Sequence, residues 1–401
     1  MKDVEQQLID WLRGRQAQMI ALCQRLIQTR SVNGVDPERD LAELIAREAE
    51  SLGLGAELYA MQTERPNVIV STAGEGETGL LLVGHLDTVP AGDESAWSHP
   101  PFAGMLADGR IYGRGAGDTK GGMTAALFAL AALQAVPGAL PGGRAQFIGV
   151  PDEETGATGT LGIKFLHERG LLHGRGAIYA YSGHQITLGH RGLVRYRLIC
   201  RGEAVHTGFD EWQDGVAGAN AVTGMARLLL ALESTPFPFS TTPYFERYRT
   251  IITPGTVIHG GVSINIVPDS CEALVDCRLT PEVCRADVDE RLQAAIRLIQ
   301  AEVPRLRFEV ELLNDAPAAF TPDDAAIVPA LDSSIREVTG VVPPRLVAGP
   351  ANEGYLLVER GIPTICGMGP TGANAHAVDE YVEVKGLVEA AMIFALTACR
   401  L

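Results

Sequence analysis

A short apolar run that ends in a histidine and an aspartate is the feature that most constrains this chain. Leu80 to Val83 are all apolar, and a run of four predicts a buried strand rather than a helix. His85 and Asp87 follow at its carboxyl end, the edge at which open α/β sheets build their sites. There His85 could ligate a metal while a carboxylate holds its second ring nitrogen. The pair is equally compatible with a structural role, so partners elsewhere in the chain must decide.

Two other segments place carboxylates beside predicted elements. Residues 113–122, Gly-Arg-Gly-Ala-Gly-Asp-Thr-Lys-Gly-Gly, precede an alanine-rich helix, and their glycines let the backbone aim Asp118. They do not form a phosphate-binding loop, because Lys120 is followed by glycine instead of Ser or Thr. The run Asp152-Glu153-Glu154 comes soon after the apolar strand 145–150. Adjacent acids in that position indicate a function rather than a solvated loop.

The order of predicted elements divides the chain into two domains. Residues 1–190 and 316–401 combine helices with apolar strands, which predicts an α/β domain with a mixed sheet flanked by helices. Residues 191–315 read β-α-β-β-α-β, the order of a ferredoxin-like α+β unit inserted in the first domain. Helices are expected at 1–29, 40–52, 123–134, 160–168, 219–233, 285–302, 325–338 and 384–399. Strands are expected at 67–71, 79–83, 145–150, 177–181, 186–189, 193–200, 256–259, 273–279, 306–313 and 365–368, with a hairpin turn at Asp108-Gly109.

Charge and cysteine content exclude several classes of partner. The net charge of −16 argues against nucleic-acid binding, which needs clustered Lys and Arg. No apolar run reaches 18 residues, so no membrane span is expected, and the N-terminus lacks the apolar core of a signal peptide. The seven cysteines are odd in number and scattered, without C-x-x-C, as in a reducing compartment. We therefore expect a cytoplasmic protein.

Five motifs in order along the chain resemble those of one family. They are His85-x-Asp87, Gly113 to Gly122, Asp152-Glu153-Glu154, Gly261-x-x-x-Asn265-x-Val-Pro and Ala375-His376. Together they resemble the zinc metallopeptidases and amidohydrolases that include acetylornithine deacetylase, succinyl-diaminopimelate desuccinylase, aminoacylase and carboxypeptidase G. The resemblance runs nearly end to end. It implies a catalytic domain with two metals, interrupted by a lid domain through which two copies form a homodimer.

The resemblance assigns roles at the metal site. The implied ligands are His85, Asp118, Glu154 and His376, with zinc as the metal and cobalt or manganese as alternatives. Asp118 would bridge two ions roughly 3.5–4 Å apart, with Glu154 and His376 on one ion and His85 on the other. Glu153 would be the general base, and Asp87 would support His85. Without the motif, His376 would read as a cap of the C-terminal segment.

Three residues of the inserted domain are implied to reach substrate. In relatives the counterpart of His206 polarises the substrate carbonyl across the dimer, whereas the alternative is an exposed loop histidine. Asn265 and Arg278 match positions that bind a substrate carboxylate. For Arg278 an ordinary salt bridge is the alternative.

The chain departs from the family pattern at one ligand. Relatives carry a fifth protein ligand, usually Glu followed by Pro, where this chain has Ala180 or Tyr181. No carboxylate stands there, so Tyr181 through its phenol or His184 through its imidazole would have to substitute. We therefore expect one tight ion and a second that is weak, absent or rescued. A further departure is Ala351-Asn352-Glu353, where relatives often have Asp.

These observations predict a metal-dependent hydrolase of an N-acyl-amino acid or a short peptide. Metal-activated water would attack the amide carbonyl, Glu153 would shuttle protons, and His206 would help to stabilise the oxyanion. One alternative is a family member with an altered metal site, acting as a one-metal or repurposed non-hydrolytic enzyme or as a binding protein. Retention of Glu153 beside Glu154 argues against a binding protein, which has no use for a general base. Another alternative is a peptidase of longer peptides.

Overall fold

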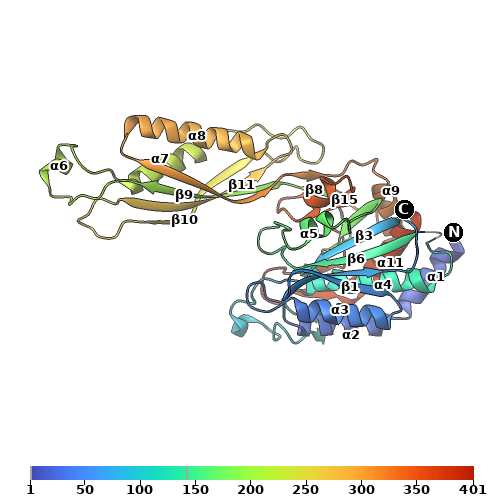
Figure 1. Ribbon diagram of the computed structural model, residues 1–401. Coiled ribbons are helices and arrows are strands. Elements are labelled where there is room, and N and C mark those ends of the chain that lie inside the picture. The colour runs from blue at the N-terminus through green and yellow to red at the C-terminus, as the bar shows by residue number, and fades with distance from the viewer. Residues whose placement is uncertain (1, 141–142) are drawn as a thin grey trace. The chain divides into compact units, whose positions relative to one another are not determined.

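The chain forms two compact units in the computed structural model, which describes residues 2–140 and 143–401 (Figure 1). The first unit comprises Met1–His190, Phe320–Ala348 and Asn352–Leu401. The second comprises Arg191–Ala319 and Gly349–Ala351, so it is inserted within the sequence of the first. None of the helices in the described residues is long and apolar enough to cross a membrane.

A six-stranded mixed sheet is the centre of the first unit. Its strands, in spatial order, are β1 (Gly55–Gln62), β2 (Arg65–Ser71), β6 (Arg144–Val150), β3 (Thr78–His85), β7 (Gly176–Tyr179) and β15 (Thr364–Ile365). The first two pairings are antiparallel and the others parallel. Every residue of β3 is buried, as expected for a central strand covered on both faces. The carboxyl ends of β6, β3 and β7 therefore meet at one edge of the sheet.

Helices cover this sheet. They are α1 (Lys2–Arg13), α2 (Gln16–Gln28), α3 (Arg39–Ser51), α4 (Gly121–Ala135), α5 (Ile163–Glu168), α9 (Ile327–Thr339), α10 (Gly354–Val358) and α11 (Val384–Arg400). The helix α4, apolar along almost its whole length, packs on β3 and β6 and against α11. The prediction of one helix over 1–29 is wrong. Gly14 and Arg15 interrupt it, since glycine is a weak helix former; Met1 lies outside the described residues.

Two smaller sheets place further loops of the first unit. One contains β13 (Ala319–Phe320), β8 (Ile186–His190) and β14 (Arg345–Ala348), and the other contains β16 (Gly372–Ala373), β17 (Tyr381–Glu383), β5 (Arg110–Tyr112) and β4 (Met105–Ala107). The predicted hairpin turn joins β4 to β5, with positive φ at both Asp108 and Gly109. Because β17 pairs with β5, the segment that carries His376 lies beside the segment that leads to Asp118.

The second unit contains a four-stranded antiparallel sheet, two longer helices that pack on it and one short helix. Its strands, in spatial order, are β10 (Ile251–Gly260), β11 (Ser270–Leu279), β9 (Gly192–Arg201) and β12 (Arg307–Ala316), and its helices are α6 (Asp210–Gln213), α7 (Ala221–Glu233) and α8 (Arg285–Glu302). Alternate residues of β9 and β11 form a core with α7 and α8. The chain order β9-α7-β10-β11-α8-β12 is ferredoxin-like. The predicted fold class, an α/β domain with an inserted ferredoxin-like unit, is confirmed.

Candidate metal centre

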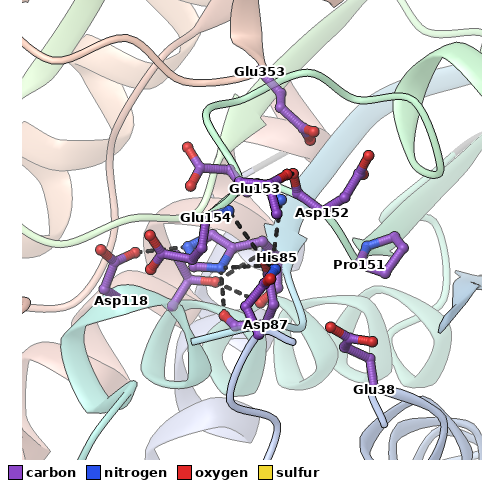
Figure 2. Close-up of polar contacts among 12 residues, drawn as sticks. Glu38, His85, Asp87, Asp118, Pro151, Asp152, Glu153, Glu154 and Glu353 are labelled. Atoms are coloured by element: carbon purple, nitrogen blue, oxygen red, sulfur yellow. Dashed lines mark hydrogen bonds and ion pairs between the residues drawn. The ribbon is translucent and has the colours of Figure 1, made fainter. Parts of the chain in front are cut away.

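Four polar side chains from four chain segments meet at the carboxyl edge of the central sheet. His85 ends β3, and Asp118 lies in the turn Ala116–Lys120 that precedes α4. Glu154 follows β6, and His376 lies between β16 and β17. Figure 2 shows His85, Asp118 and Glu154 pointing toward one another. The structure thus brings together all four residues expected to bind metal.

Asp118 lies between the two histidines and contacts each with a different oxygen. Its Oδ1 is 2.8 Å from His85 Nε2, and its Oδ2 is 3.1 Å from His376 Nε2. The same His376 nitrogen is 3.1 Å from Glu154 Oε1. Ligand atoms of His85, Asp118 and Glu154 all lie within 4.8 Å of one another, the one such group of His, Cys, Asp or Glu found in residues 2–140 and 143–401. These are nitrogen and oxygen donors of the kind that zinc accepts.

The charges of this cluster fit a divalent cation. Burial opposes a charge on His85, but Asp118 outweighs it and raises the His85 pKa well above its usual value. Hydrogen bonds to Asp118 and Glu154 raise the pKa of His376 to about 10. Without metal, two imidazolium protons therefore balance the carboxylates. A divalent ion would supply the same two positive charges and leave both histidines neutral, as ligation requires.

Glu380, which the sequence did not single out, fixes the turn that carries Asp118. Its buried carboxylate accepts hydrogen bonds from the backbone N–H groups of Gly115, Gly117 and Asp118, at 2.9 to 3.0 Å. Arg114, also buried, donates to Oε2, the oxygen that Gly115 also contacts, at 2.7 Å. A carboxylate with four donors explains how a glycine-rich segment holds one conformation.

Asp87 supports the site in two ways. Its backbone carbonyl lies 2.8 Å from His85 Nδ1, nearer than its carboxylate Oδ1 at 3.5 Å. The carboxylate instead accepts the backbone N–H groups of Glu153 at 3.3 Å and Glu154 at 3.0 Å, and the side-chain amide of Asn33. Asp87 therefore orients His85 mainly through the main chain and the acidic turn through its side chain.

Glu153 lies beside the expected ligands but contacts a different group. It is 8% exposed, and burial raises its pKa to about 8. The hydroxyl of Tyr181 donates to its Oε1 at 2.8 Å. Of the two suggested substitute ligands, Tyr181 thus lies next to the cluster, with its ring 5.8 Å from that of His85. His184 instead has Nδ1 3.9 Å from Glu389 on α11.

A second group of buried acids, which includes Asp152 and Glu353, lies next to Glu153 (Figure 2). Burial and the neighbouring carboxylates of Asp152 and Glu153 raise the pKa of Glu353 well above its usual value. Glu353 accepts a hydrogen bond from the Tyr179 hydroxyl at 3.2 Å. Asp152 accepts the backbone N–H of Leu161 at 2.8 Å. The sequence pointed to Asp152 through the acidic run Asp152-Glu153-Glu154 and to Glu353 only through the departure at Ala351-Asn352-Glu353.

The other candidate residues lie in the second unit. His206 and Asn265 adjoin each other, with Asn265 Nδ2 3.3 Å from His206 Nε2, and both side chains are exposed. Arg278 donates to Asp276 at 2.8 Å, and Arg195 donates to the same carboxylate at 2.8 Å. In the second unit Arg278 therefore forms the salt bridge that was considered for it.

Comparisons with known proteins agree with the resemblance seen in the motifs. The model of peptidase family M20/M25/M40 matches residues 81–400. A succinyl-diaminopimelate desuccinylase from Methylobacterium radiotolerans is 30% identical over 394 residues, covering 94% of each chain.

Solved structures share the fold. An M20 family metallo-carboxypeptidase from Sulfolobus solfataricus has a TM-score of 0.78 at 19% identity, covering 95% of this chain and 98% of that one. A di-peptidase from Saccharomyces cerevisiae has a TM-score of 0.77 at 15% identity, covering 100% and 99%. The chain therefore belongs to peptidase family M20/M25/M40 and is a metal-dependent amidohydrolase.

Proposed function

We propose that this protein hydrolyses the amide bond of an N-acyl-amino acid or a short peptide, with Glu153 as general base. The observation that carries the proposal is the position of Glu153. Its carboxylate is buried beside the cluster of His85, Asp118, Glu154 and His376, yet no ion pair joins it to them among the described residues. A divalent ion held within this cluster would polarise the amide carbonyl and activate a water molecule.

Glu153 would take a proton from the attacking water and deliver it to the leaving amine. A general base works best when its pKa is near the operating pH, and burial moves the pKa of Glu153 in that direction, to about 8. Asp87 serves the same step by holding the backbone of Glu153 and Glu154. The reaction thus needs a carboxylate that remains free to exchange a proton while its neighbours bind the ion.

The donor set favours zinc and two unequal sites. Asp118, Glu154 and His376 provide three ligands, which with water suffice for a catalytic zinc. Asp118 and His85 provide only two ligands for a second ion, which should therefore bind weakly or not at all. Cobalt and manganese are alternatives for both sites.

We favour an N-acyl-amino acid as the substrate, because the curated relatives at 28–30% identity are named as succinyl-diaminopimelate desuccinylases. Asn265 and Arg278 would bind the carboxylate of that substrate. Arg278 would then exchange part of its contact with Asp276 for the substrate.

We further propose a homodimer in which His206 serves the site of the neighbouring subunit. The lid domain, 191–315, would form the interface, while residues 1–190 and 316–401 form the catalytic domain. The edge strand β10 of the lid domain is largely exposed, and Val262 and Ile264 nearby are 85% and 101% exposed. All seven cysteines are free, which fits a cytoplasmic protein.

The test of the proposal is Glu153→Gln, assayed on a panel of N-acyl-amino acids and dipeptides with metal analysis of the same sample. We expect turnover to fall at least ~10²-fold with metal content and fold retained. Glu168→Gln, an exposed change at the end of α5, is the matched control and should behave like wild type. Near-normal turnover in Glu153→Gln, with metal content unchanged, would show that the base is another group.

A further inference from the structure

Tyr181 is one of the two residues, with Ala180, at which the family pattern predicts a carboxylate ligand, and its hydroxyl is directed at the base. The hydroxyl donates to Glu153 Oε1 at 2.8 Å. Tyrosine therefore contributes a hydrogen-bond donor where relatives contribute a negative charge.

The backbone at Tyr181 is held in place by two glycines and one strand. A Cβ atom added at Gly122 would lie 1.8 Å from the carbonyl oxygen of Ala180, and one added at Gly369 would lie 1.8 Å from that of Tyr181. The Ala180 N–H donates to the carbonyl of Val83 on β3 at 2.7 Å. These contacts leave the main chain little freedom, so the direction of the Tyr181 side chain is set by the fold.

The ring of Tyr181 is held as firmly as its backbone. It stacks on Tyr179 with ring centroids 5.0 Å apart and an interplanar angle of 22°. The Tyr179 hydroxyl is in turn tied to buried Glu353 at 3.2 Å. The Tyr181 ring also lies 5.8 Å from that of His85. The two tyrosines thus form a rigid pair whose hydroxyls each donate to a buried glutamate.

We propose that Tyr181 is the positioning residue for Glu153, and that the chain is built to work with a single tightly bound ion. The inference rests on the proposed role of Glu153 as the base. The Tyr181 hydroxyl engages Oε1 and leaves Oε2 to take the proton from water. A neutral hydroxyl adds no charge to balance a second cation, and here it holds the base instead.

The first test is Tyr181→Phe, which removes only the hydroxyl. Hydrogen bonds to charged groups are strong enough that kcat should fall about 10- to 100-fold. KM, metal content and melting temperature should stay close to wild type, because the ring and the ligands remain. Tyr59→Phe, which removes an exposed hydroxyl bonded to Glu57 on β1, is the matched control and should change nothing.

The second test is Tyr181→Glu, read by metal analysis. Restoring a carboxylate should raise the tightly bound metal from one ion per chain to two. A Tyr181→Phe protein that loses bound metal would identify Tyr181 as a ligand and overturn the inference. Two tightly bound ions in the wild type, or unchanged kcat in Tyr181→Phe, would overturn it too.

The double variant Tyr181→Phe with Glu153→Gln separates this inference from the proposed function. If Tyr181 acts through Glu153, the double variant should be no slower than Glu153→Gln alone, whereas independent effects would multiply. Multiplied losses would overturn the inference. If Glu153→Gln itself keeps its turnover, the proposed function fails. If only Tyr181→Phe matches wild type, the proposed function stands and this inference fails.

Discussion

His85, Asp87 and Glu153 of the first unit are held in the opposite way from His206 and Asn265 of the second unit. In the first unit His85, Asp87 and Glu153 are at most 8% exposed and are fixed by partners from distant segments of the same unit. In the second unit His206 and Asn265 are exposed, and their side chains contact nearby loop residues or each other. A buried network is organised before substrate arrives, whereas exposed side chains keep their rotamer freedom.

The comparison indicates where each set acts. The four residues expected to bind metal all lie in the first unit, where changes that remove buried contacts should cost stability as well as activity. In the proposed dimer, a second surface would order His206 and Asn265, so changes there should cost activity alone. The following predictions test this difference.

The largest effect should come from Glu380→Ala in the first unit. The change leaves the buried guanidinium of Arg114 unpaired and removes the acceptor for three N–H groups of the Asp118 turn. Breaking a buried pair costs about 3–5 kcal/mol of unfolding free energy. Urea denaturation should show this loss, and metal titration should show weaker binding.

Glu359→Ala, an exposed change after α10, is the control for Glu380→Ala. It should alter the free energy of unfolding by less than about 0.5 kcal/mol. If Glu380→Ala matches this control in stability and still binds metal tightly, the turn is organised by other contacts.

The next effect should come from His206→Ala in the second unit. Loss of an oxyanion donor typically lowers turnover about 10²- to 10³-fold. Because the side chain is exposed, melting temperature and metal content should not change. Mixing this variant with Glu153→Gln should restore activity. After random exchange about half of the dimers are hybrids and one of the two sites in each hybrid is intact, so roughly a quarter of all sites should be active.

The control mixture pairs His206→Ala with Asn265→Ala. Both changes lie in the second unit, so every hybrid site would still receive one defective lid, and no activity should return. If the His206→Ala and Glu153→Gln mixture also stays inactive after demonstrated subunit exchange, His206 does not act across a dimer.

A smaller effect is expected in metal affinity within the first unit. If three residues hold one ion and two hold the other, as proposed, calorimetric titration of metal-free protein should give one tight site and a second at least ~10-fold weaker, if it binds at all. Activity measured in parallel should saturate with the tight ion. Two equally tight ions in wild type, and again in Tyr181→Phe and His184→Ala, would contradict the unequal sites.

Sequence patterns identified site residues where the neighbouring residues in the sequence form a recognisable strand or turn. The segments carrying His85, Asp118 and Glu154 could be found because each follows an apolar strand or a glycine-rich turn. Glu380 could not, since its burial depends on β17 pairing with β5, a contact between segments 270 residues apart in sequence. The contact of Tyr181 with Glu153 depends likewise on parallel strands.

The limits of local sequence patterns also explain the errors in the predicted secondary structure. The strand β1 was missed because its side chains are mostly exposed at the sheet edge, which leaves no apolar pattern. The strand expected at 365–368 is only the two-residue β15. The N-terminal helix was predicted as continuous because Gly14 lies within an amphipathic pattern that both halves share.

The smallest expected effect is on the stability contributed by Glu282, whose hydrogen-bond partners all lie in the second unit. Glu282 accepts hydrogen bonds from Ser240, Thr241 and Thr242. Slight burial raises its pKa, but these bonds outweigh that and lower the pKa from 4.5 to about 2. Unlike His206, this exposed group is therefore organised by its own unit.

Glu282→Gln should show a pH-dependent loss of stability. Because the folded pKa is depressed, the stabilisation is fully present above pH 4.5 and declines as pH falls toward 2. Solvent screening keeps it below about 1 kcal/mol. Urea denaturation at pH 7 should therefore separate the variant from wild type, and at pH 3.5 the two should lie closer together. Glu290→Gln, an exposed change on α8, is the control and should give no such convergence. If the difference in unfolding free energy between Glu282→Gln and wild type stays constant with pH, these hydrogen bonds do not depend on the carboxylate charge.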